Sequence, residues 1–171
     1  VASIERSLAA RDAALVEAMA GDEIVLWFEH DLYDQLHVLQ VLDLLQAVRP
    51  GPTRAAAAGA RVTAILADDY LAAQSDDQLA AWFAARQRLA PEPWAAAADA
   101  WAGFRAPDPV RLAAFDHPGA WPSLRAALGR HLQQFPSVRT GLSRTEGQTL
   151  AAVATRALTV RDAFRAANHA V

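Results

Sequence analysis

Residues 23–48 read EIVLWFEHDLYDQLHVLQVLDLLQAV and contain two different hydrophobic patterns. Residues 23–29 form a short apolar run rich in β-branched and aromatic residues, which is typical of a strand buried on both faces. Asp31 stands where a helix N-cap belongs, and residues 32–48 predict a helix that ends at the Pro-Gly-Pro sequence after it. Residues 61–67, RVTAILA, predict a second strand of the same type.

Strand, helix and strand in this order predict a βαβ unit with a right-handed crossover. Two strands alone do not make a stable parallel sheet in water, so an upstream segment or a partner chain is expected to complete the sheet. The chain opens with Val1 and its only methionine is Met19, which favours the upstream segment.

Every element predicted after Asp69 is helical. Ser75-Asp76-Asp77-Gln78 predicts a capped helix that ends near Leu89, Ser143-Arg144-Thr145-Glu146 is a second capping box, and Thr159 predicts the N-cap of a last helix. The two helices that begin at these last two caps cover residues 144–156 and 160–170. The remaining predicted helices cover residues 92–105, 108–116 and 119–134, and one helix, residues 3–20, precedes the first strand. The predicted fold class is therefore α/β: a βαβ fragment of a parallel sheet, followed by an all-α C-terminal region.

The composition excludes several classes of protein. Of the 171 residues, 42 are alanine, all 16 basic residues are arginine and none is cysteine. A hydrophobic fraction of 53% excludes a disordered chain. The absence of cysteine excludes a disulfide scaffold, thiolate metal ligands and a cysteine nucleophile. We interpret the five tryptophans as residues that fill a core otherwise made of alanine and leucine.

The net charge of −3 is unevenly distributed. Residues 1–116 carry 9 arginines and 17 acids, whereas residues 117–171 carry 7 arginines and two acids. We expect a domain boundary near Pro136, with an α/β and helical body over 1–135 and a basic helical segment over 136–171. Such a segment suits contact with a polyanion, although an excess of this size also occurs on ordinary surfaces.

The sequence has no membrane segment or signal peptide that these patterns detect. No apolar run approaches the roughly 20 residues that span a bilayer, and the first twenty residues carry five charges. We therefore predict a cytoplasmic protein with no membrane partner.

Residues 23–44 and residues 135–153, FPSVRTGLSRTEGQTLAAV, resemble the two signatures of the bacterial domain-of-unknown-function family numbered 1835. The heptapeptide EHDLYDQ at residues 29–35 carries most of the resemblance. Family members usually have an N-terminal stretch with a Gly-Asp-Ser turn, which this chain lacks, and Gly147 replaces a usual polar residue. The resemblance implies a fold and a candidate patch but no activity.

Acidic residues follow both predicted strands. In an open α/β sheet, ligands bind beyond the carboxyl ends of the strands. We predict Glu29, His30 and Asp31 as catalytic residues, with His30 moving a proton. Glu29, Asp31 and Asp68 are the predicted ligands of Mg²⁺ or Mn²⁺. The remaining ligand-binding candidates are Tyr33, Asp34, His37, Asp69 and Tyr70.

These residues also have a structural interpretation. Asp31 and Asp34 suit the first turn of a helix, Asp69 suits a turn through Tyr70, and His37 suits a partly buried pair with a carbonyl. The functional alternative is a site for a phosphate-bearing small molecule, with metal-assisted phosphoryl chemistry as the reaction class that fits best.

The last two predicted helices have the arrangement of a helix-turn-helix joined by residues 157–159. The second helix would present Arg161, Arg165 and Asn168 to base edges, while Arg139 and Arg144 would hold phosphates. The rival function is thus a regulatory binding protein whose C-terminal helices contact DNA or a protein partner. Any two capped helices with a short joint look the same.

Overall fold

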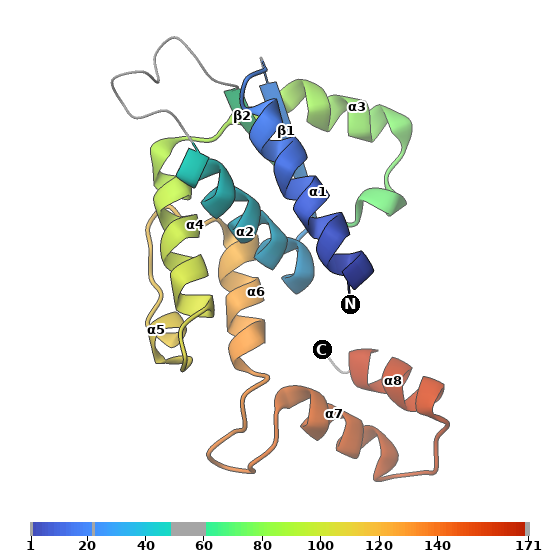
Figure 1. Cartoon of the computed structure of the whole chain (residues 1–171). Coiled ribbons are helices and arrows are strands. Elements are labelled where there is room, and N and C mark those ends of the chain that lie inside the picture. The colour runs from blue at the N-terminus through green and yellow to red at the C-terminus, as the bar shows by residue number, and fades with distance from the viewer. Residues whose placement is uncertain (1, 22, 49–60, 170–171) are drawn as a thin grey trace. The chain divides into compact units, whose positions relative to one another are not determined.

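The computed structural model describes residues 2–21, 23–48 and 61–169, and its elements are shown in Figure 1. The first part contains α1 (Ala2–Ala18), β1 (Glu23–Phe28), α2 (Leu32–Val48), β2 (Arg61–Leu66), the 3₁₀ turn η1 (Leu71–Ala73), α3 (Asp76–Ala85) and β3 (Gln87–Arg88). The remainder is helical, with α4 (Pro91–Phe104), α5 (Val110–Ala113), α6 (Pro122–Leu132), α7 (Arg144–Val153) and α8 (Val160–His169).

The sheet has three strands in the order β1-β2-β3. β1 and β2 run parallel, with Glu23 opposite Arg61 and Phe28 opposite Leu66. Together with α2 they form the predicted βαβ unit, so the predicted fold class is confirmed. The predicted α2 boundaries agree with the structure at both ends.

The prediction that residues 75–89 form one helix is wrong. α3 ends at Ala85, and Gln87–Arg88 then pair antiparallel with β2 through Ala64 and Thr63. A strand of two residues is too short to produce a period-2 pattern, so the flanking helical residues dominated the prediction. β3 covers one edge of β2, while among the described residues β1 has a strand neighbour on one side only.

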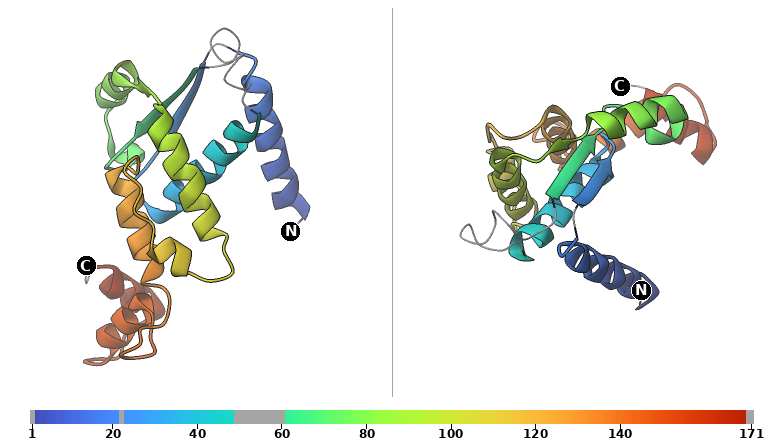
Figure 2. Two further views of the ribbon diagram at one scale, coloured as in Figure 1. Left: turned by 90° about the vertical axis from the view of Figure 1, so that its left-hand side faces the viewer. Right: turned by 90° about the horizontal axis from the view of Figure 1, so that it is seen from above.

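Different helices pack on the two faces of the sheet (Figure 2). Ile24 and Leu26 of β1 are buried, and α2, which packs against β1, contributes Leu39, Leu42 and Leu45 to the same core. On the opposite face, the ring of Trp27 stacks on Phe83 of α3 at 6.3 Å. Alternating β1 side chains thus reach both helical layers.

The alanines of α4 explain its close packing on α2. Ala96, Ala97 and Ala100 are fully buried, and small side chains let two helices approach closely. Trp94 is the one tryptophan in the buried core; the other four are half-buried. The interpretation of all five as core residues is therefore too broad, and Trp82 has another position, described below.

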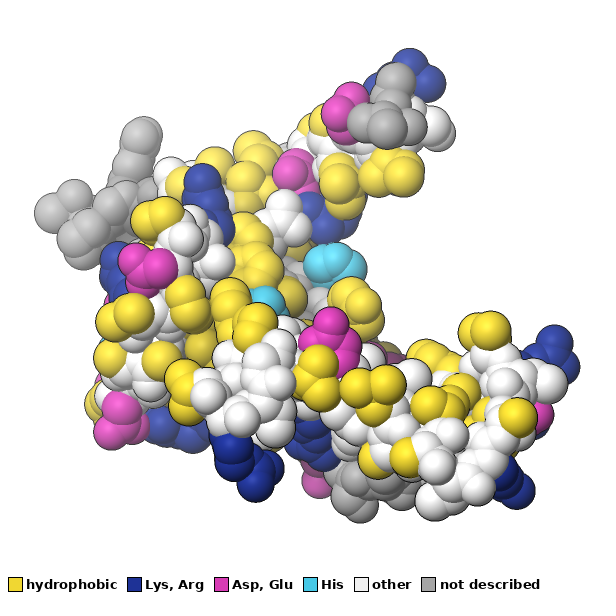
Figure 3. Space-filling model, turned by 90° about the horizontal axis from the view of Figure 1, so that it is seen from below, with side chains coloured by type: hydrophobic (Ala, Val, Ile, Leu, Met, Phe, Trp, Pro, Cys, Tyr) yellow, Lys and Arg dark blue, Asp and Glu magenta, His cyan; other side chains and the backbone are white. Residues whose placement is uncertain are grey.

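α1 is attached to α2 through its C-terminal half. Arg11 Nη2 donates to Gln40 Oε1 at 2.9 Å, whereas Ile4 and Leu8 in the N-terminal half are 66% and 44% exposed. The space-filling view shows apolar side chains at the surface of this helix (Figure 3).

The chain divides into two compact units, residues 1–127 and 128–171, and the division falls inside α6. The boundary predicted from the charge distribution lies eight residues later, beside Pro136. None of the helices in the described part of the chain is long and apolar enough to cross a membrane.

Candidate functional site

The loop after β1 is held together by its own acidic side chains. Asp31 Oδ1 accepts hydrogen bonds from the backbone N–H groups of Tyr33, at 2.8 Å, and Asp34, at 3.1 Å. Asp34 Oδ2 in turn accepts from Glu29 N at 2.6 Å. The first N–H groups of a helix have no partner within it, so these carboxylates satisfy donors that would otherwise need water.

The acids after β2 act in the same way. Asp69 Oδ1 accepts from Tyr70 N at 2.8 Å, and its Oδ2 accepts from Gln74 Nε2 at 3.1 Å. Glu29 Oε1 accepts from Leu71 N at 2.8 Å and so ties the end of β1 to the turn after β2. Four of the five predicted acids therefore have a structural role; the capping interpretation predicted this for Asp31, Asp34 and Asp69 but not for Glu29.

The predicted metal ligands are not assembled. In residues 2–21, 23–48 and 61–169, no three His, Asp or Glu side chains are arranged to hold one metal ion. Glu29 and Asp31 use carboxylate oxygens to accept from backbone N–H groups, while Asp68 is exposed at the end of β2. The positions of these three carboxylates do not fit a three-ligand Mg²⁺ or Mn²⁺ site, and we derive no step through such an ion.

His30 and Tyr70 are brought together at the strand ends. Their ring centroids lie 4.9 Å apart with an interplanar angle of 56°. His30 Nδ1 is buried without a hydrogen-bond partner in the described part of the chain, which is uncommon for a ring nitrogen in a folded protein. By contrast, Tyr33 is 77% exposed and His37 is exposed, so neither lies in an enclosed crevice.

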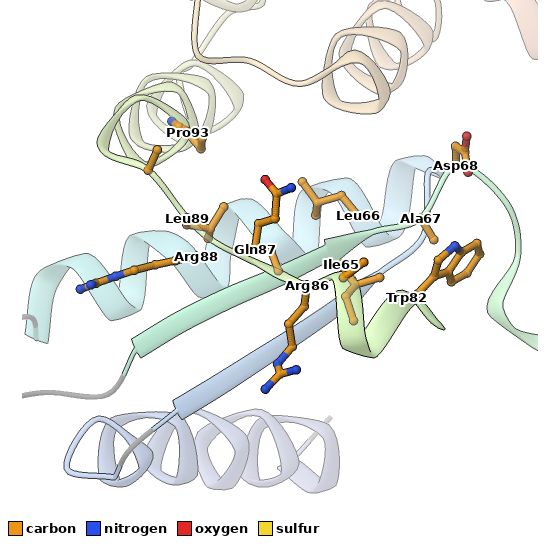
Figure 4. A pocket seen from close by; sticks show the side chains of 13 residues that line it. Ile65, Leu66, Ala67, Asp68, Trp82, Arg86, Gln87, Arg88, Leu89 and Pro93 are labelled. Atoms are coloured by element: carbon orange, nitrogen blue, oxygen red, sulfur yellow. The ribbon is translucent and has the colours of Figure 1, made fainter. Parts of the chain in front are cut away.

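A cleft of about 420 Å³ runs alongside the second half of β2 and past its carboxyl end (Figure 4). Asp68 and Trp82 lie at one end of it and Arg88 at the other. Its lining consists of residues 64–68 of β2 and its end, Trp82, residues 85–90 and Pro93. Asp68 is the one predicted site residue in this lining.

Sequence reasoning missed Trp82, Gln87 and Arg88. The sequence predicts Trp82 as a core residue, yet α3 has no fully buried residue, and Trp82 is half-buried and lines the cleft. Gln87 and Arg88 fell within the helix that the structure replaces by β3. Ser75, which caps α3 by accepting from Gln78 N at 3.2 Å, marked its start correctly, but no local signal marked its end.

The motif EHDLYDQ also contains a residue whose role the sequence did not show. Gln35 is completely buried: its Nε2 donates to the carbonyl of Glu29, and its Oε1 accepts from Trp121 Nε1, both at 2.6 Å. This bridge holds the loop after β1 against the segment that precedes α6.

In the second unit, Arg139 and Arg144 line one cavity of about 700 Å³. Arg130 lies in the last turn of α6; its Nη1 is buried with no hydrogen-bond partner in the described part of the chain. Burial and the neighbouring charge of Arg144 both lower the pKa of Arg130. Arg130 itself does not line the cavity.

α7 and α8 form a capped helix pair. Ser143 and Glu146 make the predicted capping box, and Thr159 Oγ1 accepts from Asp162 N at 3.2 Å, so both predicted caps are confirmed. The joint covers residues 154–159, longer than predicted. Ala163 and Ala167 are buried, whereas Arg161 and Arg165 are exposed; the side chain of Asn168 lies outside what the structure describes.

No protein-family model, curated protein or solved structure matches this chain. The resemblance to the family numbered 1835 therefore stays a prediction.

Proposed function

We propose that the first unit binds a small ligand in the cleft at the carboxyl end of β2. The cleft between Asp68, Trp82 and Arg88 is the observation that carries this proposal. Its position agrees with the rule that ligands bind beyond the carboxyl ends of parallel strands.

The charges at this end favour a particular class of ligand. Five carboxylates, those of Glu29, Asp31, Asp34, Asp68 and Asp69, follow the two strands. Of these five only Asp68 lines the cleft, and Arg88 lies at its other end, so a free phosphate would be repelled at the Asp68 and Trp82 end unless a divalent ion bridged it to the protein. A planar ring with a cationic or hydrogen-bond-donating group fits better, because Trp82 offers an aromatic surface and Asp68 an exposed carboxylate.

We assign no catalytic step to this site. The catalytic roles of Glu29, His30 and Asp31 remain predictions, as does the cytoplasmic location. His30 lies beside Tyr70 at the strand ends, and its buried Nδ1 has no hydrogen-bond partner in the described part of the chain.

Three matched probes test the proposal: benzamidine, a planar cation, with benzamide and benzoate as its neutral and anionic counterparts. Binding is followed by NMR shifts of the tryptophan indole N–H groups. We expect benzamidine to bind most tightly and Asp68→Asn to weaken it roughly fivefold, as expected for an exposed charge pair. Asp77→Asn, which changes an exposed acid on α3, is the matched control. Equal binding of the three probes, or equal effects of the two variants, refutes the proposal.

The same protein tests the phosphate version. A rise in the thermal midpoint with Mg²⁺ or Mn²⁺ that disappears in Asp31→Ala and Asp68→Ala supports metal-assisted phosphoryl chemistry. No shift with either ion removes that version and leaves the cleft proposal intact.

A second candidate function is DNA binding by the second unit. The shared cavity of Arg139 and Arg144 and the exposed Arg161 and Arg165 on α8 favour it. We expect salt-dependent binding to duplex DNA that weakens in Arg161→Ala and Arg165→Ala but not in Arg111→Ala. Absence of binding at low salt refutes this candidate.

A further inference from the structure

Three arginines surround a single carboxylate where β1 and β2 begin, at the opposite end of the strands from Asp68. Glu23 and Arg61 are the first residues of β1 and β2 and lie opposite each other in the sheet. Arg88 of β3 is paired with Thr63, two residues further along β2. These residues and Arg86 line a cavity of about 240 Å³. A water molecule in the liquid occupies about 30 Å³, so the cavity has room for a tetrahedral oxyanion.

Both carboxylate oxygens of Glu23 accept hydrogen bonds from neighbouring side chains. Its Oε1 accepts from Arg86 Nε at 3.1 Å and from Thr63 Oγ1 at 2.9 Å, and Arg61 Nη2 lies 3.2 Å away. Its Oε2 accepts from Arg86 Nη2 at 2.9 Å. The hydrogen bonds from Arg86 lower the pKa of Glu23 to about 2, so it stays ionised near neutral pH.

Arg86 is held rigidly in this pair. Its Nη1 donates to the carbonyl of Phe83 at 2.7 Å, and its guanidinium carbon lies 4.0 Å from the centre of the Phe83 ring. Figure 4 shows its side chain pointing away from Gln87 and Leu89 and toward β1. The Glu23–Arg86 pair therefore forms a rigid floor of the cavity with no net charge.

The guanidinium groups of Arg61 and Arg88 are the two in this cavity that the Glu23–Arg86 pair does not include. Arg61 has one long contact to Glu23, and its side chain is 53% exposed. The side chain of Arg88 makes no hydrogen bond or ion pair with the rest of the described chain, and the residue is exposed. Since Glu23 and Arg86 neutralise each other, Arg61 and Arg88 give this cavity an uncompensated charge of two.

We propose that this cavity binds the phosphate group of a small phosphorylated molecule, with Arg61 and Arg88 as its ligands. Guanidinium groups match the oxygens of phosphate in a bidentate manner, and a phosphate monoester carries close to two negative charges at pH 7. A single carboxylate would balance only one of the two arginines. Arg88 also lines the cleft, but Arg61 and Glu23 do not, so the effect of Arg61→Gln tests this site apart from the cleft proposal.

The test is a titration with inorganic phosphate at pH 7 and constant ionic strength, followed by the Nε–H resonances of the arginine side chains. We expect the Arg61 and Arg88 resonances to shift together and saturate with one Kd. Arg61→Gln and Arg88→Gln should each weaken binding roughly tenfold, the usual effect of losing one charge-assisted contact. Acetate at the same ionic strength should bind more weakly than phosphate.

Arg111→Gln is the matched control. Arg111 is also in the first unit, pairs with one acid, Asp99, and has a side chain 57% exposed, close to the value for Arg61. It should leave the phosphate Kd unchanged. Arg88→Lys, which keeps the charge but loses the planar fork, should fall between wild type and Arg88→Gln. Shifts that do not saturate, or equal Kd values in Arg88→Gln and Arg111→Gln, overturn the proposal.

Discussion

Gln35→Leu removes the buried polar bridge that joins the loop after β1 to the segment before α6. Leucine keeps most of the side-chain volume but has neither a donor nor an acceptor. The change leaves Trp121 Nε1 without its acceptor at 2.6 Å and the carbonyl of Glu29 without its donor at 2.6 Å.

The expected cost follows from these two orphaned groups. A buried polar group that loses its partner costs about 1–3 kcal/mol. Trp121 and Glu29 are half-buried, so water satisfies each of them in part. We therefore expect the free energy of unfolding of the first unit to fall by about 2–4 kcal/mol, a large part of the stability of a small domain.

Urea unfolding followed by tryptophan fluorescence measures this change. All five tryptophans lie within residues 1–127, so the signal reports on the first unit. Gln46→Leu makes the same substitution at an exposed position of α2 and should change stability by less than about 0.5 kcal/mol. Trp121→Phe combined with Gln35→Leu should cost less than the sum of the single changes, because the two residues share one hydrogen bond. Equal stabilities of the two leucine variants would refute the bridge.

Four further changes test individual positions. Because the pKa of Glu23 is lowered from 4.5 to about 2, its contribution to stability is complete above pH 4.5 and is lost as the pH falls toward 2. Glu23→Gln should abolish that part of the acid dependence, measured as urea midpoints between pH 7 and 2; an unchanged profile contradicts it. Ser143→Ala should cost α7 about 1 kcal/mol through loss of its cap, seen as faster amide exchange in its first turn. Gly119→Ala should cost about 1–3 kcal/mol, because its Cβ would overlap the carbonyl of Glu92. Gly129→Ala, whose Cβ meets nothing and which lies inside α6, should instead gain about 0.5–1 kcal/mol in thermal unfolding.

The candidate site was predictable only in part. The sequence predicts Asp31, Asp34 and Asp69 both as ligands and as caps and Glu29 as a ligand alone, and the structure uses all four to hold backbone N–H groups. The choice between the two roles depends on where each carboxylate oxygen points, which spacing along the chain does not specify. The cleft depends on Trp82 and on the turn from α3 into β3, neither of which has a local sequence pattern.

The βαβ unit, the ends of α2 and the caps of α3, α7 and α8 follow from the amino-acid sequence alone. They depend on contacts within about four residues or on the periodic burial of one face, and both leave a pattern in the chain. The pairing of β3, the Glu23–Arg86 pair and the Gln35–Trp121 hydrogen bond needed the folded chain. The two side-chain contacts join residues 63 and 86 positions apart, and only packing brings such distant donors and acceptors within hydrogen-bond distance.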